Sequence, residues 1–293
     1  MATPIGHLSD LSPRAAEVLR AVEVVAAEDT RVTRVLLRHA GSTARTLSAH
    51  GHNAQAAAAA VLDHLREGRS VALVSDAGTP AISDPGSMVV AAAHEAGFPV
   101  VPIPGPSAVT TLLCAAGLAE APFLFEGFLP ARPKQRDARL ETVGRAADAA
   151  GAILVLYEAP HRIAQTLDAL AARYPGRWVA IGRELTKAFE EVHRCRAEDA
   201  PAWLVAREGR IRGEFVLAID RGEAPQSTED AARTADTRQL LTHLLAELPA
   251  SRAVRLAQTL TGLPRDALYA QALALRRAGM PADEDADGAP GDA

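Results

Sequence analysis

The chain has 293 residues, enough for two ordinary domains or one large one, and its 48% hydrophobic residues can fill a substantial core. Its net charge of −5 argues against binding to phosphates, but five acids among residues 281–293 account for all of it, so the remainder is neutral. Cys114 and Cys195 match no metal or disulfide spacing, and no leader pattern or run of about eighteen apolar residues occurs. We therefore expect a cytoplasmic globular protein without a metal site or membrane span.

Short apolar runs alternate with helical patterns in the first third of the chain, which predicts a parallel α/β sheet. The expected strands are Val22–Ala27, Val71–Ser75 and Val100–Ile103, and the expected helices are Ala54–Arg66 and Met88–Ala96.

A second α/β block follows a boundary near Gly117–Pro122. Strands are predicted at Phe123–Phe128, Ile153–Tyr157, Val179–Gly182, Glu191–Arg196 and Phe215–Ile219, with helices at Gln135–Ala146 and Ile163–Arg173. Residues 1–117 and 118–222 are thus expected to form two α/β domains with a ligand cleft between them.

The last seventy residues differ in composition from both blocks. Residues 223–235 are polar and predict a linker, residues 236–280 predict a small helical domain, and residues 281–293 predict a disordered acidic tail. The three expected helices are Thr237–Glu247, Ser251–Leu260 and Arg265–Arg277. They fit either a helical cap on the core or a helix-turn-helix-like contact with nucleic acid.

Three Gly/Pro-rich loops follow or flank the predicted strands, at Thr3–Gly6, Ser75–Gly86 and Pro104–Ala108. Ligands in parallel α/β sheets bind at the carboxyl ends of strands, and Gly and Pro present backbone groups rigidly there. Such loops suit a zwitterionic cofactor with a sulfonium, for which Asp76 is the expected polar anchor. Each loop alone also fits an ordinary turn.

Eight segments together carry a family resemblance. They are Thr3-Pro4-Ile5-Gly6, Glu28-Asp29-Thr30-Arg31, Ser75–Gly86, Pro104–Ala108, Gly127-Phe128-Leu129-Pro130, Tyr157–Arg162, Arg183–Lys187 and Gly213-Glu214-Phe215. In this order and spacing the chain resembles the ribosomal RNA small subunit methyltransferase I family, a branch of the tetrapyrrole methylases.

The resemblance implies an α/β, two-domain tetrapyrrole-methylase-like fold with S-adenosylmethionine in the cleft, plus a small C-terminal helical domain. It also implies a homodimer that methylates the ribose 2′-hydroxyl of a cytidine in the decoding centre of 16S ribosomal RNA, within the 30S subunit. The cofactor contacts that it implies are Pro4, Asp76, Ala77, Gly78, Thr79, Ser107, Ala108, Tyr157, Glu184 and Phe215.

The sequence departs from the family at one point. Family members have a β-strand before the Thr3–Gly6 loop, whereas only Met1 and Ala2 precede it here. A missing central strand leaves sheet hydrogen bonds unpaired and a groove in the core. We therefore expect a start assigned too late, and poor stability for the chain as written.

Lys187 and Glu158 are the candidate catalytic residues, because a ribose hydroxyl needs a base or a cation that stabilises the developing alkoxide. Of 31 basic residues only Lys134 and Lys187 are lysines, which singles Lys187 out. The alternatives are a structural ion pair for Lys187 and pairing with Arg162 for Glu158.

Candidate RNA contacts are the cationic stretch Arg132, Lys134 and Arg136, together with His161 and Arg162. The alternatives are a solvated helix face for the first three and helix capping for the last two.

Two other functions remain open, because a fold does not determine a reaction. One is methylation of a small molecule, such as a tetrapyrrole, or of a protein. The other is non-catalytic ribosome binding, which requires no cofactor.

Overall fold

The computed structural model describes residues 1–206 and 212–222, and residues 237–275 except 238, 247, 264, 266, 267, 270 and 274. The chain divides into two compact units, Met1–Ala224 and Pro225–Ala293. The predicted linker at 223–235 and the predicted tail at 281–293 lie outside the described residues.

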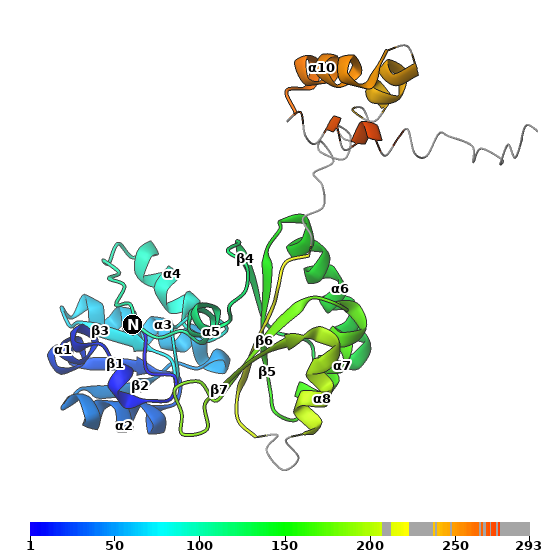
Figure 1. Cartoon of the computed structure of the whole chain (residues 1–293). Coiled ribbons are helices and arrows are strands. Elements are labelled where there is room, and N and C mark those ends of the chain that lie inside the picture. The colour runs from blue at the N-terminus through cyan, green and yellow to red at the C-terminus, as the bar shows by residue number, and fades with distance from the viewer. Residues whose placement is uncertain are drawn as a thin grey trace, which may run out of the picture. The chain divides into compact units, whose positions relative to one another are not determined.

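The first sheet has three parallel strands in the order β2-β1-β3. Its strands are β1 (Val24–Ala27), β2 (Arg45–Ser48) and β3 (Val71–Val74). Its helices are α1 (Pro13–Ala21) and α2 (Thr30–Ala40) on one face, with α3 (Ala54–Arg66) and α4 (Ser87–Glu95) on the other (Figure 1). β1 is buried throughout, as expected for an apolar central strand covered on both faces.

The strand predicted at Val100–Ile103 is wrong, because the structure has no strand there. The amino end of the chain lies between this segment and β3: the Met1 ammonium donates to the Leu73 carbonyl at 2.9 Å, and the Ala2 N–H donates to the Ile103 carbonyl at 3.1 Å. Two residues are too few to form a strand that would continue the sheet to Val100–Ile103. Burial lowers the pKa of the Met1 ammonium.

A groove of about 830 Å³ lies beside β3. Most of its walls are apolar side chains of α1, α3, α4, β3 and residues 98–103. Apolar surface without packing partners loses dispersion contacts and hydrophobic stabilisation, so we expect the groove to lower the stability of this layer.

The second sheet has five strands in the order β4-β5-β8-β6-β7. Only β4 and β5 are parallel neighbours; the other three pairs are antiparallel. Its strands are β4 (Phe123–Phe128), β5 (Ile153–Glu158), β6 (Trp178–Arg183), β7 (Glu191–Arg196) and β8 (Phe215–Ile219).

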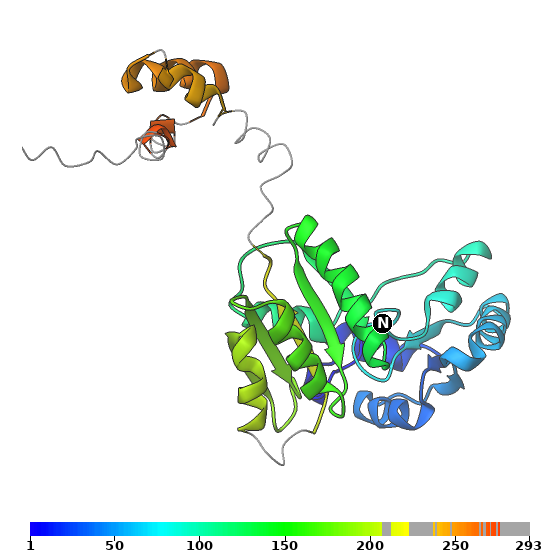
Figure 2. The ribbon, with the colours of Figure 1, turned by 90° about the vertical axis from the view of Figure 1, so that its right-hand side faces the viewer.

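Helices cover both faces of the second sheet (Figures 1 and 2). On one face lie α6 (Pro133–Ala149), α7 (Ile163–Arg173) and α8 (Ala200–Val205), and on the other lies α5 (Ala108–Ala115). Short 3₁₀ helices occur at Leu8–Asp10, Gly51–Asn53 and Ala197–Asp199.

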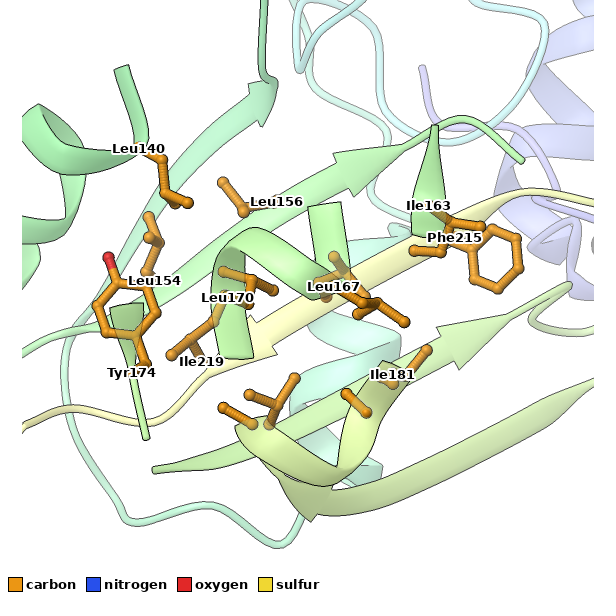
Figure 3. Packing of buried hydrophobic residues seen from close by; sticks show 14 of the residues in the cluster. Leu140, Leu154, Leu156, Ile163, Leu167, Leu170, Tyr174, Ile181, Phe215 and Ile219 are labelled. Atoms are coloured by element: carbon orange, nitrogen blue, oxygen red, sulfur yellow. The ribbon is translucent and has the colours of Figure 1, made fainter. Parts of the chain in front are cut away.

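Side chains along each strand of the second sheet point alternately to its two faces, so they belong to two hydrophobic cores. In β5, Leu154 and Leu156 face α6 and α7, whereas Ile153 and Val155 face α5. Figure 3 shows the first core, in which Leu167 and Leu170 of α7 pack over β5, β6 and β8. Both faces are apolar because both are covered, which explains the continuous apolar runs in the sequence.

In the second unit, α10 (Ala250–Thr261) ends at Gly262, which adopts the left-handed conformation common at helix ends. Further described helical residues occur in 237–246 and 265–275. Leu241, Val254, Ala257 and Leu268 form its buried core.

Among the described residues, no helix is long and apolar enough to span a membrane, and no cluster of three His, Cys, Asp or Glu side chains could hold a metal ion.

Filling the groove beside β3 should stabilise the chain. An amino-terminal extension of about six residues with alternating Val and Ile should fill the groove, pair with β3 and raise Tm by about 3 °C or more. Thermal unfolding followed by circular dichroism measures the shift. The control is an equally long Gly/Ser extension, which should leave Tm unchanged; equal Tm values for the two extensions would contradict the prediction.

Candidate functional site

The three Gly/Pro-rich loops meet at one edge of the first sheet, as the sequence predicts. Thr3 and Gly78 exchange two backbone hydrogen bonds, of 2.8 and 3.0 Å, and the Thr3 hydroxyl donates to the Ser75 carbonyl at 3.1 Å. The Thr79 hydroxyl donates to the Pro106 carbonyl at 3.2 Å. These bonds hold loops from three distant parts of the sequence in one fixed wall.

A fourth loop, 184–190, joins this wall from the second sheet. The His7 N–H donates to the Thr186 hydroxyl at 3.1 Å. A Cβ at Gly6 would lie 2.5 Å from Lys187 Cγ, so only glycine permits this approach. Glu184 and Thr186 have positive φ, a strained conformation that is concentrated at functional sites.

A cavity of about 360 Å³ lies where these loops face the ends of β5 and β8. Its volume falls within the range of small-molecule sites. Seven of the ten residues predicted to contact a cofactor line it: Ala77, Gly78, Thr79, Ser107, Ala108, Tyr157 and Phe215.

The charged side chains that line this cavity are all acidic: Asp84, Glu158 and Glu214. Burial raises the pKa of Asp84 to about 6, and the negative charges of Glu28, Asp76 and Glu214 contribute to the shift. Crowded carboxylates favour a cation. The cavity therefore suits a positively charged ligand.

Tyr157 supplies an aromatic wall and a neutral hydroxyl. Burial raises its pKa, the charge of Asp84 adds to this, and a hydrogen bond with Ser107 opposes it. The rings of Phe125 and Phe128 contact Tyr157 edge-on, with centroid distances of 4.9 and 5.5 Å.

Three predicted contacts, Pro4, Asp76 and Glu184, are absent from the cavity lining. Asp76 instead accepts a hydrogen bond from the Asp29 N–H at 2.9 Å, which fixes the loop before α2. Glu184 accepts from Lys187 Nζ at 2.8 Å and from the Glu214 N–H at 2.9 Å. Both carboxylates thus hold neighbouring segments of the chain, and Asp84, from the same loop as Asp76, lines the cavity.

Lys187 is not among the cavity-lining residues, but it lies between two carboxylates, one of which lines the cavity. Its ammonium donates to Glu184 at 2.8 Å and to the cavity residue Glu214 at 3.0 Å. Burial lowers its pKa, but these hydrogen bonds outweigh that effect and the net shift is upward. The geometry favours a charged lysine over a neutral base.

Glu158 lines the cavity but is fully engaged. It is 2% exposed and accepts from Thr166 at 2.6 Å and from the Ala159 N–H at 2.8 Å, and it pairs with Arg162 at 3.0 Å. Removing one partner of a buried ion pair lowers the free energy of unfolding by about 3–5 kcal/mol. A substitution of Glu158 would therefore change stability whether or not Glu158 takes part in catalysis. This geometry favours the structural alternative for Glu158.

The candidate RNA contacts divide by exposure. Arg132, Lys134 and His161 are exposed. Arg136 is 5% exposed and donates to Gln165 at 2.9 Å, so it stabilises the packing of α6 on α7 and cannot reach RNA as predicted. Arg162 donates to the Leu129 carbonyl at 2.5 Å besides pairing with Glu158.

The sequence interpretation missed ten lining residues: Ile5, Ile82, Ser83, Asp84, Phe128, Ala159, Pro160, Leu185, Glu214 and Val216. All but Val216 belong to a recognised motif, so the segments were identified but not the side chains that line the cavity. For Asp84, the cause is backbone conformation, because Ala81 and Ser83 both have positive φ and turn the loop in a way that composition does not reveal.

This fold and its acidic, loop-bounded cleft define a tetrapyrrole-methylase-type protein. Residues 2–201 match the family described as Tetrapyrrole (Corrin/Porphyrin) Methylases. The structure is similar to that of the methyltransferase CobJ, with a TM-score of 0.55 and 20% identity over 75% of this chain and 91% of that one. It is also similar to diphthine synthase, with a TM-score of 0.56 and 14% identity over 74% and 87% of the two chains. The two-domain α/β fold class is thereby confirmed.

Sequence comparison defines the branch. The chain is 45% identical to the Ribosomal RNA small subunit methyltransferase I of Escherichia coli O157:H7, over 92% of each chain. It is 46% identical to the protein of that name from Mesorhizobium japonicum, over 94% of this chain and 91% of the relative. Residues 231–276 match the family described as RsmI C-terminal HTH domain. The chain belongs to the ribosomal RNA small subunit methyltransferase I family.

Proposed function

We propose that this chain transfers the methyl group of S-adenosylmethionine to the 2′-hydroxyl of a cytidine in the decoding centre of 16S ribosomal RNA. The proposal rests on the acidic cavity, which is lined by residues of seven of the eight family motifs. Identity of 45% to a ribosomal RNA small subunit methyltransferase over nearly the whole chain supports the RNA substrate. It disfavours a small-molecule or protein substrate and a purely structural role.

The residues present fit the cofactor. S-adenosylmethionine carries an ammonium and a sulfonium, which match Asp84 and Glu214 in the cavity. Gly78 has φ +79 and a backbone N–H and C=O bound to Thr3, so the loop is rigid before any ligand binds. Apolar residues, among them Ile5, Ala108 and Val216, supply further surface of the cavity.

The bound cofactor supplies a methyl group that its sulfonium already activates for displacement. The protein must align the ribose oxygen with that methyl group, so that the C–O bond forms as the C–S bond breaks and the cofactor leaves as the neutral thioether. The proton of the hydroxyl passes to solvent water while a cation stabilises the developing alkoxide. The Lys187 ammonium would stabilise the developing alkoxide, and its hydrogen bond to the cavity residue Glu214 supports this role.

Exposed cations beside β4 support contact with the RNA backbone. Arg132 and Lys134 are exposed at the start of α6, directly after the cavity residue Phe128 and the buried Leu129. His161 is exposed next to the cavity residue Pro160. From the family resemblance we extend the proposal to a homodimer that acts in the cytoplasm on the assembled 30S subunit.

The direct test is methyl transfer. The full chain, labelled S-adenosylmethionine and 30S subunits from a strain lacking the modification should give one label, on a cytidine 2′-oxygen of 16S RNA, mapped by nuclease digestion and mass spectrometry. Fully modified 30S subunits are the control and should remain unlabelled. Label on protein, or no label with cofactor bound, would contradict the proposal.

The charge of Asp84 should make cofactor binding depend on pH. Only about a tenth of a carboxylate with a pKa near 6 is ionised at pH 5, so the affinity for the cationic cofactor should fall from pH 7.5 to pH 5. Calorimetry should show this fall in the wild type and a smaller one in Asp84→Asn, which retains the neighbouring Glu28, Asp76 and Glu214. Identical pH profiles for the two proteins would rule out the role of Asp84.

Lys187 and Lys134 form a matched pair for testing the catalytic cation. Lys187→Ala should lower kcat about 100-fold with S-adenosylmethionine still bound, because a stabilising charge is lost. Lys134→Ala should raise KM for 30S subunits and leave kcat unchanged. Near-wild-type kcat in Lys187→Ala would exclude the proposed role.

A further inference from the structure

An exposed aromatic ring stands at the mouth of the cavity. Phe128, the last residue of β4, lines the cavity yet is 54% exposed. Its ring contacts Tyr157 edge-on at 5.5 Å, which fixes its position. Exposure of half a phenylalanine is unfavourable in the free protein, so a binding partner that covers the ring would recover that energy.

A β-bulge brings this ring to the cavity. Phe125 pairs with Val155 and Gly127 pairs with Leu156, so Glu126 is an extra residue in β4. Without it, Phe125 and Phe128 would point to opposite faces of the sheet; with it, both lie on the face of Val155 and Tyr157. Bulges of this kind commonly redirect a side chain near an active site.

The bulge packs against the Ser75–Gly86 loop. Gly127 has φ +77, and a Cβ there would lie 2.6 Å from the Ser83 hydroxyl, next to Asp84. The strand end and the loop therefore position each other. This contact places the ring of Phe128 and the carboxylate of Asp84 around one cavity.

The ring lies on the substrate side of the cavity. A volume of about 360 Å³ lies near the lower end of the range for small-molecule sites, so we expect the cofactor to fill most of the cavity and the second reactant to approach from its exposed side. Phe128 is at that mouth and is followed by the exposed cations Arg132 and Lys134. Single-stranded RNA is bound by this combination of aromatic rings for bases and cations for phosphates.

We propose that Phe128 is the stacking platform for an unpaired nucleobase of the RNA substrate, which aligns the adjoining ribose hydroxyl with the cavity. This inference rests on the proposed RNA methylation and assigns the residue that holds the substrate. Phe128 contributes a flat apolar face and does not take part in proton transfer.

The test compares variants of two exposed phenylalanines on the same face of β4. Phe123 is 50% exposed and pairs with Ile153 at the other end of the strand, outside the cavity lining. Phe128→Ala should lower kcat/KM for 30S subunits about 5- to 150-fold, which corresponds to the loss of one base stack. Its Kd for S-adenosylmethionine by calorimetry should stay within about twofold, and Phe123→Ala should behave as the wild type.

Two further variants separate stacking from simple apolar contact. Phe128→Tyr retains a flat ring and should keep most activity, whereas Phe128→Leu retains apolar area without a ring and should resemble Phe128→Ala. Unchanged kcat/KM in Phe128→Ala, or equal activity of the Leu and Tyr variants, would overturn the proposal. Loss of cofactor affinity in Phe128→Ala would assign the ring to the cofactor instead. A wild-type protein that transfers no methyl group to 30S subunits would overturn the proposed function, and the stacking role with it.

Discussion

The paired backbone hydrogen bonds between Thr3 and Gly78 are the constraint on which the cleft depends. They join the amino-terminal loop to the loop after β3, and Thr79 extends the connection to Pro106. Gly6 then allows the fourth loop to approach from the second sheet. Each loop alone would be an ordinary turn. Held together, they form a rigid wall opposite the ends of β5 and β8.

Electrostatics gives this wall its chemical character. Asp84 and Glu214 present negative charge toward the cavity, while the cations Lys187 and Arg162 lie beside it in ion pairs with carboxylates. Burial raises the pKa of Asp84, and repulsion from neighbouring carboxylates, which a cationic cofactor would relieve, adds to the shift. The exposed cations at the start of α6 favour phosphates outside the cavity, so the two reactants are attracted to different parts of one site.

Sequence reasoning succeeded where a local pattern determines the structure. Helices Ala54–Arg66 and Ile163–Arg173 and strands Phe123–Phe128 and Phe215–Ile219 were predicted to the residue, because periodicity and turn residues mark their limits. Helices α1, α2, α5 and α8 and strand β2 were not anticipated. Strand β2 is short and partly exposed, so it carries little apolar signal. The strand at Val100–Ile103 failed because strand formation depends on a neighbouring chain, which periodicity cannot show. At the site, the motifs identified the right loops, but the positive φ of Ser83 and the bulge at Glu126 decide which side chains face inward.

We infer that the cavity between these loops and the second sheet holds S-adenosylmethionine with its positive groups toward Asp84. A crystal structure of the chain with the cofactor bound would show whether it does. We expect cofactor density in the cavity lined by Gly78, Tyr157 and Phe215, with the ammonium or sulfonium within about 4 Å of the Asp84 carboxylate. Density in the groove beside β3, or an empty cavity at saturating cofactor, would contradict it.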